Sequence, residues 1–267
     1  MDHTLLTDRE FKQFQAFIYD KAGIYLSEAK KPLVWGRLNR RLQHHALRTF
    51  QDYFQWITSG HDPEELQLAI DLLTTNETYF FREEEHFEYL GRQIIQERPA
   101  RFSLWCAACS SGEEPYSLAM TLSEHLGGAT GWTILASDIS ARVLETAKTG
   151  LYPLERSHNI PRHYLKKYCL KGINEYTGSF LVAKPLRDRV RFTQINLNRA
   201  LPNIGPFDVI FLRNVLIYFD LPTKQAVIQR ATQVLKPGGF LFVSHSESLA
   251  GITSSLKMIK PSIYRYG

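Results

Sequence analysis

The sequence has few cysteines. Its 267 residues include only three, and an odd number gives no disulfide framework. Cys106 and Cys109 form a CxxC pair, but Cys169 is the only other cysteine, whereas a structural zinc site usually needs four ligands. We therefore expect no metal site and simple burial of small side chains. So few cysteines are typical of a reducing compartment, which predicts a cytoplasmic location.

The sequence also lacks a long apolar run. Leu126–Ser137, among the longest stretches without a charge, is far below the ~20 apolar residues that a membrane span needs. The first residues, MDHTLLTDREF, have neither the basic region nor the apolar region of a secretory signal. We expect no direct insertion into a membrane.

Charge of one sign is not in large excess. The formal net charge is +5, too small to demand nucleic acid as a partner. Six basic residues and no acidic one nevertheless lie between Lys30 and Arg48. The 44% hydrophobic and 22% charged residues are ordinary for a folded globular protein.

Residues 1–74 carry only helical patterns and predict an all-helical N-terminal domain. Thr7 and Glu10 fit a capping box, and apolar residues then recur at helical spacing. A second helix starts near Pro32 and runs to about Leu47, and two shorter helices are expected at Phe50–Ser59 and Glu64–Leu73. One face of the second helix is basic, with Arg37, Arg40, Arg41 and His44 at positions i, i+3, i+4 and i+7.

After Pro99 apolar runs alternate with helical ones. The expected strands are Phe102–Ala107, Thr133–Ala136, Val209–Leu212 and Phe240–Ser244. The expected helices between them are Pro115–Leu126, Ala141–Thr149 and Thr223–Leu235. This alternation predicts an α/β domain over residues 101–267, in which a parallel sheet binds its ligand at the carboxyl ends of the strands. Residues 75–100 are the expected linker and covering segment.

One stretch interrupts the alternation between Tyr152 and Arg189. Tyr176–Ala183 and Val190–Gln194 fit a small antiparallel insertion hinged at Gly172 and Gly178, although Val190–Gln194 also fits a strand of the main sheet. We place the insertion at about residues 168–192.

Acidic residues follow the first two expected strands. Glu113 and Glu114 stand where a pyrophosphate site would have glycines, and they suit a ligand with positive charge. Alternatively, both simply favour the start of a helix. Asp138 ends the second strand, where an acid accepts hydrogen bonds from ribose hydroxyls or caps the next helix.

Polar residues also interrupt two apolar stretches. Arg213 and Asn214 follow a buried strand, where a charge needs a ligand or a carboxylate partner, and Tyr218 would face the same cleft. Leu73–Glu83 (LTTNETYFFRE) reads as a lid over the strand ends or as ordinary helix packing. His245 and Glu247 are expected to be ordinary loop residues.

Three features favour S-adenosylmethionine over a dinucleotide. They are the acids in place of phosphate-binding glycines, the acid placed for ribose, and the segment LKPGGFLFV that closes the strand and helix alternation. Methyl transfer then needs mostly alignment of donor and acceptor, which can supply about 7–11 kcal/mol of the barrier.

These segments together resemble the CheR-type protein-glutamate O-methyltransferases, which methylate chemotaxis receptors. The motifs that carry the resemblance extend over nearly the whole chain: AGIYL, TTNETYFFRE, SSGEEPYSLA, ASDIS, QINL, FLRNVLIYF and LKPGGFLFVSHSE. The resemblance implies a class I S-adenosylmethionine-dependent methyltransferase (Rossmann-like) sheet, an N-terminal helical domain and a small antiparallel β insertion. It also implies S-adenosylhomocysteine as product and glutamate methyl esters in chemotaxis adaptation.

The resemblance also implies roles for particular residues. Tyr218 resembles the tyrosine beside the transferred methyl group, and Arg82 resembles one of the residues that close over the cofactor. We expect Arg82 and Tyr218 to be catalytic, because an Arg and a Tyr can hold the acceptor carboxylate in line with the methyl group. The residues that resemble cofactor contacts are Asn76, Thr78, Arg82, Glu114, Asp138, Asn196, Leu197, Arg213 and Asn214. The inserted subdomain corresponds to one that, in some members, docks a peptide at the receptor's C-terminus.

A glutamate acceptor agrees with the residue types. A Glu side chain, with a pKa near 4.3, is ionised at pH 7, so the nucleophile needs no strong base. The basic face of Arg37, Arg40 and Arg41 would bind the acidic helical bundle of a receptor, or it is only a solvated face. Rival readings are a nucleic-acid methyltransferase, against which no DPPY-like motif is present, and a non-catalytic S-adenosylmethionine-binding module.

Overall fold

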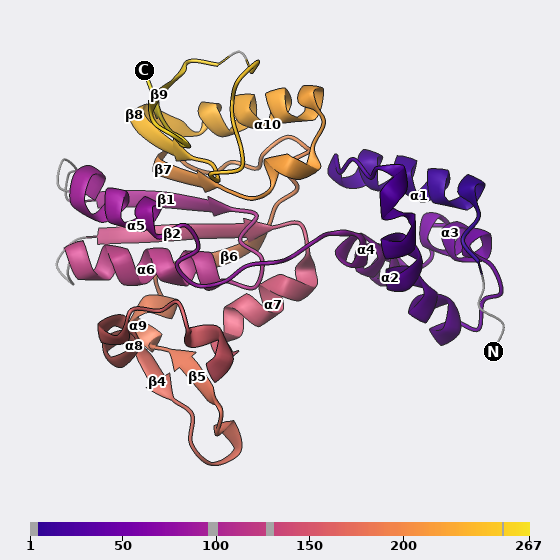
Figure 1. The fold of residues 1–267 in the computed structure, drawn as a ribbon, viewed down its shortest axis with the longest axis horizontal. Coiled ribbons are helices and arrows are strands. Elements are labelled where there is room, and N and C mark those ends of the chain that lie inside the picture. The colour runs from indigo at the N-terminus through magenta and orange to yellow at the C-terminus, as the bar shows by residue number, and fades with distance from the viewer. Residues whose placement is uncertain (1–4, 96–100, 127–130, 253) are drawn as a thin grey trace.

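The N-terminal part of the chain is a bundle of four helices. The computed structural model describes residues 5–95, 101–126, 131–252 and 254–267. The helices are α1 (Asp8–Ala22), α2 (Lys31–His44), α3 (Phe50–Thr58) and α4 (Pro63–Leu73), with a short 3₁₀ turn, η1 (Glu28–Lys30), before α2 (Figure 1). The all-helical character expected from the sequence is confirmed.

Local capping and aromatic packing fix this bundle. The Glu10 N–H donates to Thr7 Oγ1 at 3.2 Å, and the Thr7 N–H donates to Glu10 Oε2 at 2.9 Å, so the expected capping box begins α1. Phe14 of α1 meets Phe50 of α3 edge to face, with ring centroids 6.3 Å apart. Both rings are fully buried, and each such burial contributes about 1.5–3 kcal/mol.

The rest of the chain is built on a seven-stranded sheet in the order β6-β2-β1-β7-β8-β10-β9. Its strands are β1 (Arg101–Ala107), β2 (Gly131–Asp138), β6 (Val190–Gln194), β7 (Phe207–Leu212), β8 (Leu235–Phe242), β9 (Leu256–Lys260) and β10 (Ile263–Tyr266). The strands from β6 to β8 run parallel, and β10 is antiparallel to both β8 and β9. The strand order reverses between β1 and β7, which is where such sheets bind ligands.

Alternate residues of β1 face opposite sides of the sheet. Leu104 and Cys106 belong to one buried cluster, and Trp105 and Ala107 belong to another. The helices that pack on the sheet are α6 (Glu113–Leu126), α7 (Ala141–Thr149) and α10 (Leu221–Gln233). Cys106 and Cys109 are free and buried, as expected from the sequence.

The inserted sheet differs from the predicted boundaries of about 168–192. It consists of β3 (Leu151–Pro153), β4 (Cys169–Lys171) and β5 (Ser179–Val182), in the order β3-β5-β4. Val190–Gln194 is not part of it, because this segment pairs in parallel with β2 as the edge strand of the main sheet. The insertion therefore starts and ends earlier in the chain than predicted. It also contains α8 (Arg162–Tyr168) and the turns η4 (Leu154–Ser157) and η5 (Asn174–Tyr176). The short helix α9 (Lys184–Arg187) leads back to β6.

The linker between the two parts begins as an extended segment. It continues into α5 (Glu84–Tyr89) and a π-helical turn, η2 (Leu90–Ile94). In Figure 1 the arrowheads of β1 and β2 point toward the N-terminal helices, and the linker runs from those helices to the sheet. Among the described residues, no helix combines the length and apolar character needed to cross a bilayer.

Candidate active site

A cavity lies where β1, β2 and β7 end. The linker and the end of α1 close its other sides, through Thr74, Thr75, Ala22 and Ile24. All ten residues predicted for the cofactor or for catalysis line this cavity: Asn76, Thr78, Arg82, Glu114, Asp138, Asn196, Leu197, Arg213, Asn214 and Tyr218. The structure thus brings together residues that are separated by more than a hundred positions in the chain.

A tight turn after β1 forms the floor of this cavity. Ala108, Ser110 and Gly112 all have positive φ angles, of 57°, 48° and 97°. A Cβ at Gly112 would lie 2.7 Å from Tyr152 Oη and 2.8 Å from Ala147 Cβ, so only glycine fits there. The turn thus brings main-chain atoms, with little side-chain bulk, to the end of the strand.

Asp138 is fixed by this same turn. Its carboxylate accepts a hydrogen bond from the Ser110 N–H at 2.8 Å and another from the Ser140 N–H at 2.9 Å. Burial raises the pKa of Asp138, and the hydrogen bonds from these amides oppose that rise. The N-cap of α7 is Ser140, so the alternative in which Asp138 caps this helix is wrong. Each carboxylate oxygen keeps a further lone pair for a hydroxyl group.

The two acids at the start of α6 point to different places. Glu113 is buried and pairs with Arg156 of the insertion at 3.0 Å. Glu114 lines the cavity, and its Oε2 lies 2.8 Å from Arg213 Nη1. Only the second of the two acids can therefore act on a ligand.

Arg213 is held between two carboxylates. Its side chain has no exposed surface, and Nη2 lies 2.9 Å from Glu83 Oε2 while Nη1 contacts Glu114. The guanidinium carbon also lies 5.6 Å from the ring centroid of Phe87. The sequence left open whether Arg213 meets a ligand or a carboxylate partner. The structure shows that it lines the cavity and also forms buried ion pairs. Burial raises the pKa of Glu114, and the Arg213 guanidinium opposes that rise. Two carboxylates around one guanidinium favour a cationic ligand beside them.

Glu247 holds part of the site in place through contacts that the sequence did not reveal. It is buried, and its carboxylate accepts hydrogen bonds from the N–H groups of Ser244 at 2.8 Å, Asn214 at 3.0 Å and Ile217 at 3.3 Å. These bonds fix the turn η6 (Leu216–Tyr218), which carries Tyr218. The only signal in the sequence was an acid three residues beyond the expected strand Phe240–Ser244.

The linker segment is tied down on several sides. Ser110 Oγ donates to the Asn76 carbonyl at 2.9 Å, and Arg156 of the insertion donates to the Thr78 carbonyl at 3.0 Å. Arg82 donates to the Glu77 carbonyl at 3.2 Å and lies over the ring of Tyr79. The segment therefore covers the cavity, as the lid alternative expected.

The N-terminal helices also reach the cavity. Asn196 Nδ2 donates to the Lys21 carbonyl at 2.6 Å, and the Tyr25 N–H donates to the Tyr218 carbonyl at 2.8 Å. Ile24 forms a β-bridge with Phe219. One amide hydrogen of Asn196 is thus used within the protein, and the other remains for a ligand.

The three arginines predicted to bind substrate have different surroundings. Arg37 donates to the Thr74 carbonyl at 2.8 Å and so supports the linker. Arg41 donates to Glu65 Oε1 at 2.9 Å and thereby joins α2 to α4. Arg40 is exposed on the surface of α2. The basic face is therefore not one uniform surface.

The sheet with this strand order, the acid at the end of β2 and the carboxylates beside the cavity fit a methyltransferase that uses S-adenosylmethionine. Two family models match the chain: CheR methyltransferase, all-alpha domain, over residues 9–74, and CheR methyltransferase, SAM binding domain, over residues 76–265. The chain belongs to the CheR methyltransferase family.

Curated relatives match over almost the whole length. The chain is 40% identical to the chemotaxis protein methyltransferase of Escherichia coli (strain K12), covering 97% of this chain and 91% of that protein. It is 41% identical to chemotaxis protein methyltransferase 2 of Pseudomonas aeruginosa, covering 97% and 93%. The protein from Salmonella typhimurium is 38% identical, with 97% and 90% covered.

Proposed function

We propose that the protein transfers the methyl group of S-adenosylmethionine to glutamate side chains of chemoreceptors. The observation that carries this proposal is that all ten residues inferred from the motifs line one cavity, where Arg213 pairs with the carboxylates of Glu83 and Glu114. Family membership and the names of the relatives support a chemotaxis substrate. The product is a glutamate methyl ester, formed in chemotaxis adaptation, with S-adenosylhomocysteine as the second product.

The cavity residues fit this cofactor by their chemistry. S-adenosylmethionine supplies a methyl group activated by a positively charged sulfur. In our proposal Asp138 accepts hydrogen bonds from the ribose hydroxyls, and Glu114 with Arg213 lies near the charged part. Asn196 and Leu197 lie on the adenine side, Asn214 lies beside Arg213, and Asn76 and Thr78 cover the cofactor. The linker and the turn after β1 line the cavity on two sides and exclude water from the bound cofactor.

Arg82 and Tyr218 are the proposed catalytic residues. A glutamate acceptor is already ionised at neutral pH, so it needs orientation rather than deprotonation. Burial raises the pKa of Tyr218, so its phenol keeps its proton at neutral pH and can donate a hydrogen bond to the acceptor. The Arg82 guanidinium can hold the same carboxylate. No histidine lines the cavity among the described residues, in agreement with a reaction that needs no general base.

The acceptor would reach this site from the side of α2. Arg40 is exposed and suits an acidic receptor helix, and Arg37 on the same helix adds positive charge, whereas the charge of Arg41 is paired with Glu65. A receptor helical bundle with acidic methylation sites is thus the proposed partner, and it implies a cytoplasmic enzyme.

A second contact is proposed at the insertion. β4 is an edge strand of the small sheet, so its unpaired main-chain groups can bind an extended peptide. Leu170, Ile173 and Tyr176 near it are exposed apolar side chains, with 58%, 69% and 51% of their surface accessible. These features suit an apolar or aromatic peptide such as a receptor C-terminus.

The test is incubation with labelled S-adenosylmethionine and receptor-containing membranes. A base-labile methyl ester on receptor protein is the expected result. Label in nucleic acid, with binding that weakens steeply as salt rises, would show the rival substrate. Binding of the cofactor without transfer to any acceptor would show a non-catalytic module.

A further inference from the structure

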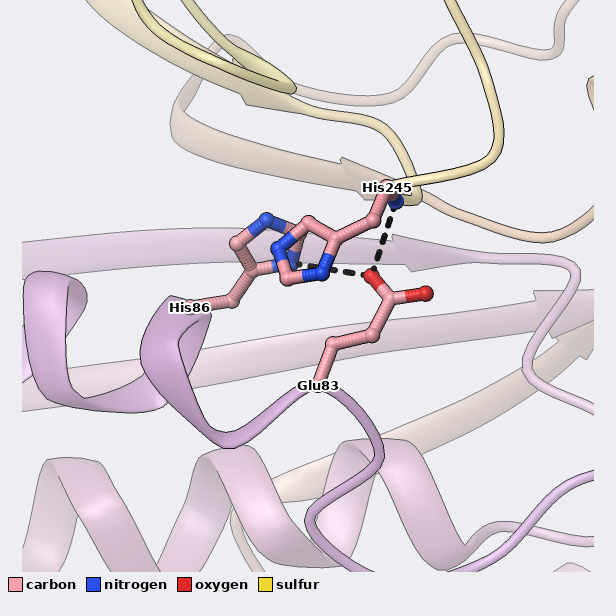
Figure 2. Close-up of side chains that lie close together, drawn as sticks. All are labelled: Glu83, His86 and His245. Carbon is pink, nitrogen blue, oxygen red and sulfur yellow. Dashed lines mark hydrogen bonds and ion pairs between the residues drawn. The ribbon is translucent and has the colours of Figure 1, made fainter.

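Three side chains with metal-binding atoms meet outside the cavity. Glu83 comes directly before α5, His86 lies within α5, and His245 follows β8. One ligand atom from each lies within 4.8 Å of the others. Figure 2 shows both imidazole rings next to the Glu83 carboxylate.

His86 presents a lone pair to this cluster. Its side chain is 2% exposed, and its Nε2 lies 2.7 Å from Ser262 Oγ. The single hydroxyl hydrogen of Ser262 is donated to the Pro261 carbonyl at 2.6 Å, so His86 Nε2 must be the donor in that contact. Nδ1 therefore carries no hydrogen, and it is a buried atom with no hydrogen-bond partner.

We propose that Glu83, His86 and His245 bind a divalent transition-metal ion of the zinc type. His86 Nδ1 and Glu83 Oε2 are 3.4 Å apart, close to the edge of roughly 3.3 Å between two ligands of a tetrahedral zinc with bonds of about 2.0–2.1 Å. Two imidazoles and one carboxylate are a donor set that zinc accepts, with a water in the fourth position. The hydrogen bond from Nε2 to Ser262 orients the ring in the way that outer partners orient metal-bound histidines.

His245 is the solvent-exposed ligand of the proposed site. It is exposed, so it can adjust its ring to the ion, whereas His86 is fixed. The two ring centroids are 4.6 Å apart.

Arg213 is the group that opposes metal binding. Its Nη2 lies 2.9 Å from the same Glu83 oxygen, so an ion competes with the guanidinium for that oxygen. Arg213 still keeps Glu114 as a partner at 2.8 Å. The bound ion therefore makes the cavity side of the cluster more positive, which disfavours a sulfonium ligand. Metal and S-adenosylmethionine must then weaken each other's binding by the same factor.

The test is a titration of the metal-free, full-length protein with Zn²⁺ in a calorimeter, followed by Co²⁺ absorption spectra. We expect one equivalent to bind, and His245→Ala to weaken it about tenfold or more. His158→Ala, which removes an exposed histidine elsewhere, is the matched control and should bind normally. Saturating Zn²⁺ should raise the dissociation constant of S-adenosylmethionine several-fold in the unchanged protein but not in His245→Ala.

Three outcomes would overturn the proposal. They are no stoichiometric binding, equal binding by His245→Ala and the unchanged protein, and a thiolate charge-transfer band with Co²⁺, which would place the ion at the cysteines. A dissociation constant for S-adenosylmethionine that Zn²⁺ does not change would overturn the coupling between the two sites.

Discussion

The Glu247 carboxylate accepts a hydrogen bond of 3.0 Å from the Asn214 N–H, and this bond joins the segments that follow β8 and β7. Asn214 has a φ of 57°, a conformation that non-glycine residues seldom adopt. The same carboxylate also accepts from Ser244 and Ile217. One buried acid therefore fixes the turn that presents Tyr218 to the cavity.

Replacing Glu247 tests whether this residue supports both the stability of the fold and the rate of methyl transfer. In Glu247→Ala three N–H groups lose their acceptor, and the one of Ser244 is buried, which costs about 1–3 kcal/mol of unfolding free energy. We also expect kcat to fall about tenfold, because Tyr218 is no longer held in place. Urea unfolding and initial rates measure the two effects. Glu247→Gln keeps one acceptor oxygen, so its stability and its kcat should lie between those of the unchanged protein and Glu247→Ala. A normal kcat in Glu247→Ala would exclude a positioning role.

Changing Asp138 tests the proposed ribose contact. Asp138→Asn keeps the shape and one acceptor oxygen for the turn, but it removes the charge. Hydrogen bonds to a charged acceptor contribute about 1.5–3 kcal/mol, so we expect the affinity for S-adenosylmethionine to fall about tenfold or more. Titration calorimetry measures it, with Glu175→Gln on the distant turn η5 as control. Equal affinity in the two variants would remove Asp138 from the site.

The sequence located the cavity because strand ends follow from the alternation of strands and helices. Once the parallel order was inferred, Glu114, Asp138 and Arg213 had to meet at one edge of the sheet. Their packing partners could not be inferred in the same way. Neighbouring residues on a helix point about 100° apart, so one of Glu113 and Glu114 faces the cavity and the other faces the insertion. The spacing of the motif alone does not tell which of the two acids faces the cavity.

The insertion and the basic face show the same limit. Val190–Gln194 has the apolar pattern of any edge strand, and only its parallel pairing with β2 places it in the main sheet. Arg37, Arg40 and Arg41 share a face of α2, yet two of them are used within the protein because Thr74 and Glu65 lie opposite. These partners come from other elements, which periodicity within one helix does not report.

Arg40 is the best probe of receptor binding. Arg40→Glu reverses an exposed charge on α2, so we expect the KM for receptor to rise several-fold, with the largest effect at low salt. The affinity for S-adenosylmethionine and the unfolding free energy should stay the same. Lys257→Glu on β9 makes the same charge change at another exposed position and serves as control. If both variants raise KM equally, only the net charge of the protein matters.

Arg41 should behave differently, because it stabilises the helical domain. Its side chain is 21% exposed, and it pairs with Glu65, which is 5% exposed. Arg41→Ala removes the charged hydrogen bonds of that buried carboxylate, which keeps His45 and Tyr53, so we expect a loss of about 1.5–3 kcal/mol of unfolding free energy. Urea unfolding of Arg41→Ala and Arg40→Ala compares the two positions directly. Equal stabilities would show that the ion pair contributes nothing.

The same ion pair should make stability depend on pH. Burial raises the pKa of Glu65, but hydrogen bonds from Arg41, His45 and Tyr53 outweigh burial and lower it to about 2. The unfolded value is near 4.5, so the unfolded chain takes up the proton first. The contribution of Glu65 is therefore complete above pH 4.5 and is lost as the pH falls toward 2.

Urea unfolding at several pH values between 7 and 3 measures this contribution. Below pH 4.5 the unfolding free energy of the unchanged protein should fall more steeply than that of Glu65→Gln, whose amide does not titrate. Glu64→Gln, at the exposed neighbouring position, should follow the unchanged protein. Parallel curves for all three proteins would mean that Glu65 is no better stabilised as a carboxylate in the folded state than in the unfolded chain.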